Sequence, residues 1–436
     1  MPPAFTTAIL SDGNTRRILL RLPPLEPFSG TTRIRTGGHI TLTSGEFLYA
    51  DHHATTPVAP EVVAAMAPWA AFSGNPSSVH AAGRAARHAV EEAREEVARA
   101  IGGVPGEIVF TSGGTEADNL AVRGAAFAAR HSDPARQAIL FTAAEHPAVR
   151  EAARSLEPFG FAPVEIPCDR DGLPLAAKVE ERLGGATAVL SAILANNETG
   201  VVNGSIPDLA RRSRAAGVLV HTDAVQAVGK IPVDVTSLGV DLLSLTAHKF
   251  GGPKGAGALW VRKGVRLSPL ATGGGQETGR RAGTENVAAI VGLGTALRLA
   301  VSRLEAEAAR LSALRDRFER GLRAAIPGLR VNGTGTLRSG TLRLPTATSA
   351  VFPGVLGEVL LAALDLEGIA ASGGSACASG TTKPSTVLLA MGLTPADARA
   401  TLRFSFGATT MSGEIDRLLE AVPRLWARAA SAKGAC

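Results

Sequence analysis

Short runs of apolar, β-branched residues alternate along most of the chain with longer stretches rich in Ala, Arg and Glu. The short runs are typical of buried strands, because a strand covered on both faces carries few polar positions. From about residue 47 onward, strands are expected at 107–111, 138–142, 188–194, 218–222, 242–246 and 258–261. Helices are expected between them, at 116–129, 147–156 and 206–216. This alternation predicts an α/β fold with a mostly parallel sheet.

The last third of the chain has a different pattern. A long charged segment, 289–326, predicts one helix that leads into a second domain. Strands expected at 349–352 and 401–406, with helices between them, indicate a smaller α+β unit. We therefore predict three parts. Residues 1–45 form an N-terminal extension of unknown role, residues 46–300 form a large domain whose first segment packs on the small domain, and residues 301–436 form the small C-terminal domain.

Composition narrows the class of protein. The chain has 436 residues, of which 45% are hydrophobic and 19% charged, so most of it is expected to fold around a core. No uninterrupted apolar run reaches about 18 residues, and the most apolar helical stretch, 287–301, contains Arg298, so we predict no membrane-spanning helix.

The net charge is +6, and half of the excess lies in residues 1–45. The remainder is balanced and lacks a basic stripe with aromatic residues, which argues against nucleic-acid binding. The N-terminal segment is rich in proline and has no amphipathic period, which favours extra structure or a loose extension over a targeting segment.

Three cysteines, Cys168, Cys377 and Cys436, form no CxxC pair and no zinc-type spacing, so we predict no metal site and a reducing, cytoplasmic setting. The pair His52 and His53 does not change this prediction, because adjacent side chains on a strand point in opposite directions.

Polar motifs follow three of the expected strands, where an open α/β sheet binds its ligands. After 107–111 comes a Gly turn and a helix start, whose backbone N–H groups and Thr115 hydroxyl suit a phosphate; the alternative is an ordinary capped helix. After 218–222, Asp223 could pair with a protonated ring nitrogen, or could simply cap the next helix.

The third motif follows the strand 242–246. Lys249 is expected to be partly desolvated there, which makes its amine nucleophilic, whereas Lys254 fits an ordinary surface lysine. The adjacent glycines leave room for a flat cofactor, and Thr246 and His248 can face a phosphate. A phosphate cradle, a carboxylate for a ring nitrogen and a nucleophilic lysine are together what pyridoxal 5'-phosphate requires.

Further motifs occur in order from about residue 47 to 417, and with these the chain resembles the cysteine desulfurases, a class V group of fold-type I pyridoxal-phosphate enzymes. The matching motifs are ADHHATTP, GNPSSVH, TSGGTEADN, AEH, NNETG, HTDAVQAVGK, AHKFGGPKG, GGGQETGRRAGTEN, SGGSACASG and LRFSFG. The fold-type I architecture is thus expected, with the small domain carrying the catalytic cysteine loop. Gln276 departs from the pattern, since some relatives have histidine there.

The resemblance also implies residue roles. Lys249 would bind the cofactor covalently, Asp223 would pair with its ring nitrogen, and Gln226 would hydrogen-bond its ring hydroxyl. His146 would stack on the ring and transfer protons. The implied phosphate contacts are Gly114, Thr115, Thr246 and His248, and Thr284 would contact the phosphate of a second subunit. Asn197 and Arg403 would orient the substrate, with Arg403 forming two parallel hydrogen bonds with the substrate carboxylate. From the alternating pattern alone, Arg403 could equally lie on a solvated strand face.

Cys377 decides the expected reaction. It lies among glycine, serine and alanine residues, which suit a mobile loop better than a core position, whereas Cys168 fits a packing role and Cys436 an incidental one. The sequence predicts a homodimer that converts L-cysteine to L-alanine and passes sulfur from Cys377 to an acceptor protein in iron–sulfur cluster assembly or tRNA thiolation. The alternatives are a selenocysteine lyase, another class V enzyme, and a non-enzymatic sulfur-carrier platform that binds the cofactor.

Overall fold

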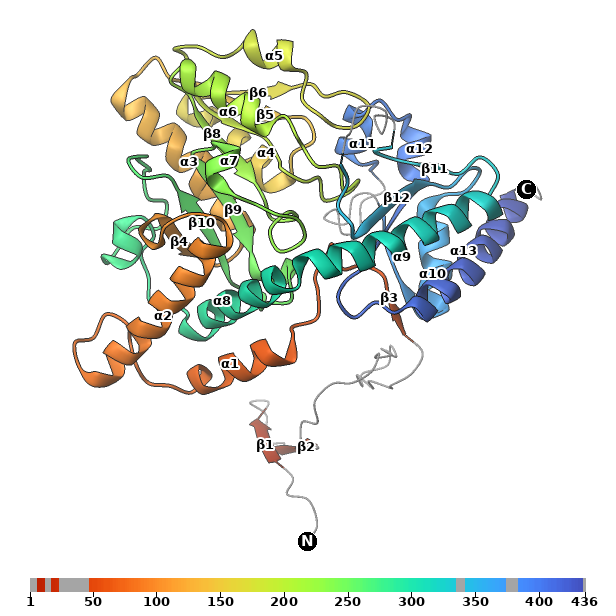
Figure 1. Cartoon of the computed structure of the whole chain (residues 1–436), viewed down its shortest axis with the longest axis horizontal. Coiled ribbons are helices and arrows are strands. Elements are labelled where there is room, and N and C mark those ends of the chain that lie inside the picture. The colour runs from red at the N-terminus through yellow and green to blue at the C-terminus, as the bar shows by residue number, and fades with distance from the viewer. Residues whose placement is uncertain (1–5, 12–16, 23–46, 335–341, 374–382, 434–436) are drawn as a thin grey trace. The chain divides into compact units, whose positions relative to one another are not determined.

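The computed structural model describes residues 6–11, 17–22, 47–334, 342–373 and 383–433, and the chain divides into two units, residues 1–47 and 48–436. In the first unit, the described strands β1 (Thr6–Ser11) and β2 (Arg17–Leu22) form an antiparallel hairpin in which Thr6 lies opposite Leu22. The second unit contains the expected α/β fold and is shown with its elements in Figure 1.

Seven described strands form the main sheet, in the order β4-β10-β9-β8-β7-β5-β6. The pairs from β9 to β6 are parallel, and β10 runs antiparallel to both of its neighbours. The strands are β4 (Ile108–Thr111), β5 (Ala138–Thr142), β6 (Ala162–Ile166), β7 (Thr187–Ser191), β8 (Leu219–Asp223), β9 (Leu242–Thr246) and β10 (Gly257–Val261). The expected mostly parallel sheet is thus confirmed.

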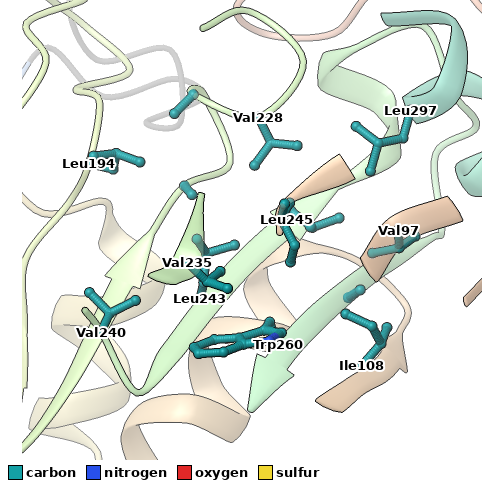
Figure 2. Close-up of a cluster of buried hydrophobic side chains, with 14 of the residues drawn as sticks. Val97, Ile108, Leu194, Val228, Val235, Val240, Leu243, Leu245, Trp260 and Leu297 are labelled. Carbon is teal, nitrogen blue, oxygen red and sulfur yellow. The ribbon is translucent and has the colours of Figure 1, made fainter. Parts of the chain in front are cut away.

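Alternate residues of the strands enter two separate cores, one on each face of the sheet. In β9, Leu243 and Leu245 join the core that contains residues of α2 (Ala81–Ala100) and α8 (Val287–Ser302). Leu242 joins the core that contains residues of α3 (Gly114–Ser132). The same alternation in β10 sends Trp260 to the first core and Leu259 to the second. Period-two alternation between two apolar cores leaves no solvated face, which explains why most positions of these strands are apolar. Figure 2 shows part of the first core.

Three helices of this part of the chain lie close to the expected ranges 116–129, 147–156 and 206–216, and the other helices were not predicted. The helices are α1 (Pro60–Ala70), α2 (Ala81–Ala100), α3 (Gly114–Ser132), α4 (Pro147–Arg154), α5 (Ala176–Glu180), α6 (Ile206–Ala215) and α7 (Val235–Leu238), with 3-10 turns at Pro105–Glu107, Glu157–Phe159, Ala247–Lys249 and Gln276–Gly279.

The prediction of a single long helix over 289–326 is wrong. The chain forms α8 (Val287–Ser302) and α9 (Leu304–Ala325), which meet at Arg303 with a bend of 71°. The physical reason is packing: Leu293 and Leu297 of α8 lie in the first core, whereas Phe318 and Leu322 of α9 lie in another. Two helices that bury their faces in different cores gain more apolar contact by bending than by continuing straight.

That other core belongs to a second, four-stranded sheet with the order β11-β12-β15-β14. Its strands are β11 (Arg330–Val331), β12 (Ala347–Val351), β14 (Ser372–Gly373) and β15 (Thr401–Ser405), and its helices are α10 (Gly357–Leu366), α11 (Thr386–Ala390), α12 (Pro395–Arg399) and α13 (Ser412–Lys433). A separate parallel pair joins β3 (Leu48–Tyr49) to β13 (Ile369–Ala370), and Leu48 and Ala50 are buried in the same core.

Among the described residues, no single helix is long and apolar enough to cross a membrane. The bent pair α8 and α9 meets that criterion only jointly, by length and composition.

Candidate functional site

A cavity of about 370 Å³ lies where the carboxyl ends of the main-sheet strands converge. Ten of the predicted site residues line it, namely Gly114, Thr115, His146, Asn197, Asp223, Gln226, Thr246, His248, Lys249 and Arg403. Thr284 is exposed and lies outside this lining. Cys377 and Cys436 lie outside the described residues. The structure therefore brings together residues that are up to 289 positions apart in the chain.

Lys249 ends the 3-10 turn that follows β9, and its side chain reaches the cavity. Its Nζ donates hydrogen bonds to the backbone carbonyls of His53 and Ala54, at 2.6 and 2.8 Å. These two carbonyls come from the segment that follows β3, so that segment fixes where the amine lies.

Asp223 is the last residue of β8 and is buried. Burial raises its pKa to about 6, against the opposing effects of the Val225 N–H, which donates to Oδ1 at 2.9 Å, and of Lys249. A carboxylate that remains ionised at neutral pH in this position suits a protonated ring nitrogen.

The cavity has a second end at the start of α3. A Cβ atom added at Gly114 would come within 2.8 Å of Val225 Cγ2, so this position has room for a backbone but not for a side chain. Thr115 follows in the first turn of the helix, Thr246 lies beside Gly114, and His248 also lines the cavity. Hydroxyl groups and the N-terminal N–H groups of a 19-residue helix form an anion cradle.

His146 caps the N-terminus of α4, where its Nδ1 accepts a hydrogen bond from the Ala148 N–H at 3.1 Å. Burial, then the charges of Lys249 and Arg150, lower its pKa to about 4. The ring is therefore neutral at pH 7, and because Nδ1 is an acceptor its proton lies on Nε2.

The Gln226 amide is bonded at both of its polar atoms. Nε2 donates to the His53 carbonyl at 2.9 Å, and Oε1 accepts a hydrogen bond from Lys230. Burial lowers the pKa of Lys230 well below its usual value, with further contributions from Lys249 and Arg403. His53 in turn contacts Thr346 Oγ1 through Nε2, at 2.8 Å.

Arg403 is buried rather than on a solvated strand face. Its Nη2 donates to Asp51 Oδ1 at 2.7 Å and its Nη1 to the Asn197 carbonyl at 2.8 Å, while Nε has no hydrogen-bond partner among the described residues. The side-chain Oδ1 of Asn197 is likewise buried without a partner there. Buried polar atoms left in this state beside a cavity indicate a polar ligand.

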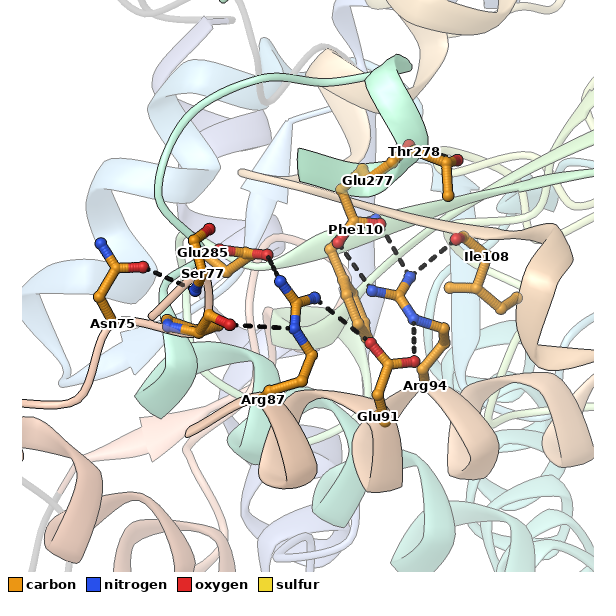
Figure 3. A network of polar contacts seen from close by, with 11 residues as sticks. Asn75, Ser77, Arg87, Glu91, Arg94, Ile108, Phe110, Glu277, Thr278 and Glu285 are labelled. Atoms are coloured by element: carbon orange, nitrogen blue, oxygen red, sulfur yellow. Dashed lines mark hydrogen bonds and ion pairs between the residues drawn. The ribbon is translucent and has the colours of Figure 1, made fainter. Parts of the chain in front are cut away.

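The loop that carries Thr284 is held to α2 and α3 by ion pairs, as Figure 3 shows for α2. Glu277 is buried and forms two hydrogen bonds with Arg94, both at 2.8 Å, and it also accepts the Phe110 N–H. Glu277 and Thr278 have φ of 47° and 55°, an uncommon conformation for residues other than glycine. Fixed contacts on both sides keep this strained turn in place.

Sequence reasoning missed several residues of the site. The cavity is also lined by His53, Ala54, Asp118, Ile193 and Val225, while Asp51 and Lys230 bond to lining residues. A signal existed for Asp118, because it follows Thr115 by three positions and therefore lies on the same face of α3.

Cys168 is partly buried beside a small apolar cluster, in keeping with the packing role, and burial raises its pKa to about 11.

The residues present fit pyridoxal 5'-phosphate. The cavity offers an amine, a carboxylate for a ring nitrogen and, at its other end, the anion cradle that begins at Gly114, where a side chain would fill the space. On the carboxyl ends of a mostly parallel α/β sheet, this donor set defines the class of pyridoxal-phosphate-dependent enzymes.

Comparisons with known proteins narrow the class. The family model described as aminotransferase class-V matches residues 48–418. The chain is 44% identical over 379 residues to the cysteine desulfurase IscS of Dictyoglomus turgidum, covering 87% of this chain and 94% of that protein. A solved structure titled NifS-like protein matches with a TM-score of 0.80 and 34% identity, covering 88% of this chain and all of that one. Another, titled SspA in complex with cysteine, matches with a TM-score of 0.72 and 35% identity, covering 82% and 98%.

The chain belongs to the class V aminotransferase family and, within it, to the cysteine desulfurases. It is therefore a pyridoxal-phosphate-dependent enzyme, as the motifs predicted.

Proposed function

We propose that the protein converts L-cysteine to L-alanine and transfers the sulfur to an acceptor. The observation that carries the proposal is the cavity in which Lys249, Asp223, His146 and Arg403 converge. The curated relative named above is a cysteine desulfurase, and a related structure is a complex with cysteine, which supports the same substrate here.

In this proposal the cavity residues divide the work of holding the cofactor. Lys249 would bind it covalently, Asp223 would keep its ring nitrogen protonated, Gln226 would hydrogen-bond its ring hydroxyl, and His146 would stack on the ring. The phosphate would be held by Gly114, Thr115, Thr246 and His248, together with Thr284 of a second copy of this chain; all of these residues except Thr284 line the cavity. When bound, pyridoxal phosphate supplies an electron sink for the bond changes at the substrate.

Arg403 and Asn197 orient the substrate. The contacts of Arg403 with Asp51 and the Asn197 carbonyl leave its Nε–H free of described partners, so the guanidinium can still fork a carboxylate. The unpartnered Asn197 Oδ1 accepts a donor of the substrate or the cofactor. His146, neutral at pH 7, holds a proton on Nε2 and exchanges it with the reacting groups.

Cys377, in the SGGSACASG segment, takes the sulfur. Its thiolate attacks the substrate sulfur, so that a sulfur–sulfur bond forms and the carbon–sulfur bond breaks. The electron pair of the broken bond stays with carbon, which accepts a proton and becomes the methyl group of alanine, while Cys377 holds the sulfur as a persulfide. A thiol of the acceptor protein then takes the persulfide sulfur and restores the Cys377 thiol.

The organisation and surroundings are part of the same proposal. We infer a homodimer in the cytoplasm that serves iron–sulfur cluster assembly or tRNA thiolation. We also infer that residues 46–300 form the large domain and 301–436 the small one. The bend at Arg303 between α8 and α9 and the separate apolar cores support that division.

Alanine release from L-cysteine in the presence of a reductant tests the proposal. Wild type and the control Cys168→Ala are expected to release alanine, whereas Lys249→Ala and Cys377→Ala are not. If wild type releases alanine only from selenocysteine, and Cys377→Ala does so too, the protein is a selenocysteine lyase. If wild type binds the cofactor but releases no alanine from either substrate, with or without an added acceptor protein, the non-enzymatic platform is correct.

A further inference from the structure

Three carboxyl groups are buried together at the cavity, two of them in its lining. Asp118 of α3, Glu145 after β5 and Asp223 of β8 are at most 4% exposed. Carboxyl oxygens of Asp118 and Asp223 and a ring nitrogen of His146 all lie within 4.8 Å of one another. The mechanism above uses Asp223 and leaves Asp118 and Glu145 without a role.

Two cations near this group donate hydrogen bonds to backbone carbonyls and to a hydroxyl. Lys249 donates to the His53 and Ala54 carbonyls, and Arg150 donates to Thr386 Oγ1 and to the Glu145 carbonyl. The described residues contain no lysine or arginine ion pair to Asp118, and its Oδ1 has no hydrogen-bond partner there.

Two histidine rings lie beside Asp118: that of His146, with a nitrogen within 4.8 Å of a carboxyl oxygen, and that of His221, whose Nε2 lies 3.6 Å from Asp118 Oδ1. Both ring nitrogens of His221 are already engaged by hydroxyls, Nδ1 by Ser191 and Nε2 by Ser244, each at 2.9 Å. Burial lowers the pKa of His221 to about 3, so the ring is neutral and supplies no positive charge.

Asp223 is better placed than Asp118 to carry the negative charge. It accepts the Val225 N–H and faces Lys249, and its pKa rises only to about 6. Burial, and then the charge of Asp223, raise the pKa of Asp118 well above its usual value, against the opposing effect of a hydrogen bond with the Ser244 hydroxyl, while burial raises the pKa of Glu145 to about 8. Two ionised carboxylates at this separation in a buried site repel each other, so one holds a proton.

We propose that Asp118 is a neutral, protonated carboxyl group and a positioning residue, which packs beside Asp223 and leaves it as the single negative charge that faces the ring nitrogen of the cofactor. The proposal rests on the cofactor role assigned to Asp223. Its main consequence concerns the cofactor-free protein. Because the carboxyl group of Asp118 releases its proton more easily in the unfolded chain than in the folded protein, the free energy of unfolding is expected to fall as pH rises.

The test is Asp118→Asn in the cofactor-free protein, with melting temperature measured from pH 5 to pH 8.5. The variant is expected to melt at a higher temperature than wild type, by a margin that grows with pH. The matched control is Asp241→Asn, a buried aspartate that accepts hydrogen bonds from Arg262 and the Val220 N–H. This control is expected to melt at a lower temperature than wild type. A margin for Asp118→Asn that is absent, or that shrinks with rising pH, overturns the proposal.

Cofactor titration supplies a second readout. Asp118→Asn is expected to bind pyridoxal phosphate at least tenfold more tightly than Asp223→Asn does; equal losses in the two variants contradict the proposal. If Asp118→Asn does not fold, the infrared spectrum of wild type labelled with [13C]aspartate decides. A labelled band of a protonated carboxyl at pH 7 supports the proposal, and its absence overturns it. None of these measurements depends on desulfurase turnover. A failure of the proposed desulfurase function can therefore be distinguished from a failure of the proposal for Asp118.

Discussion

Removing the guanidinium of Arg94 is expected to destabilise the fold strongly. Arg94 and Glu277 form a bidentate pair whose side chains are 8% and 1% exposed. Arg94→Met leaves the Glu277 carboxylate buried with the Phe110 N–H as its other contact, and it also removes a donor to the Ile108 carbonyl. Breaking a buried pair on one side costs about 3–5 kcal/mol, because the remaining charge stays desolvated.

Equilibrium urea unfolding at pH 7 measures this cost. The control is Arg303→Met, which breaks an exposed pair with Glu61 and is expected to cost about 0.2–1 kcal/mol. The double variant Arg94→Met/Glu277→Met is expected to lose less free energy of unfolding than the two single variants lose in sum, by at least about 1 kcal/mol, because neither charge is left unpaired. If Arg94→Met lowers the free energy of unfolding by no more than the surface control Arg303→Met does, the reasoning is refuted.

Two further predictions concern buried groups near the cavity. Lys230→Met is expected to weaken pyridoxal-phosphate binding about tenfold, or about 1.4 kcal/mol, because the Gln226 amide loses the donor at Oε1; fluorescence titration measures it, and Lys178→Met at an exposed pair is the control. Unchanged affinity would contradict the assigned role of Lys230. Glu198→Gln is expected to stabilise the cofactor-free protein increasingly as pH rises, by up to about 3 kcal/mol at pH 8, as urea unfolding at pH 5, 6.5 and 8 will measure. Burial raises the pKa of Glu198 from 4.5 to about 7, against the Ser385 hydroxyl that donates to it, so the stability that protonated Glu198 contributes is fully present below pH 4.5 and is lost as pH rises through 7. A difference independent of pH would show that Glu198 ionises normally.

Much of the large domain could be predicted because its strands are apolar on both faces and end in polar residues. Asp223 and Lys249 were identifiable for that reason, since each follows such a strand. The break at Arg303 was not predictable, because no Gly or Pro marks it and helical periodicity continues on both sides. It depends on which core each half meets, and a local pattern does not contain that information.

The polar contacts next to the site were not predictable from the sequence either. Lys230 follows Gln226 by four positions in a segment of turns, and its sequence neighbours do not indicate that its amine is buried. Asp51 meets Arg403 across 352 positions, and only the pairing of distant segments brings them together. The motif ADHHATTP contains Asp51 and His53, but their acceptors and donors lie too far away in the chain to be read from it.

The pairing of β3 with β13, and the contacts of the segment after β3, have a consequence for synthesis of the chain. Asp51 bridges to Ser405, the His53 N–H donates to the Ser405 hydroxyl, and the carbonyls of His53 and Ala54 hold Lys249. A nascent chain can complete the main sheet once residue 261 has emerged from the ribosome. The contacts of Asp51 and His53 with Ser405 can form only after β15 has emerged, about 140 residues later. These contacts of the segment that holds Lys249 are therefore completed only near the end of translation, and a chain truncated before residue 401 would lack them.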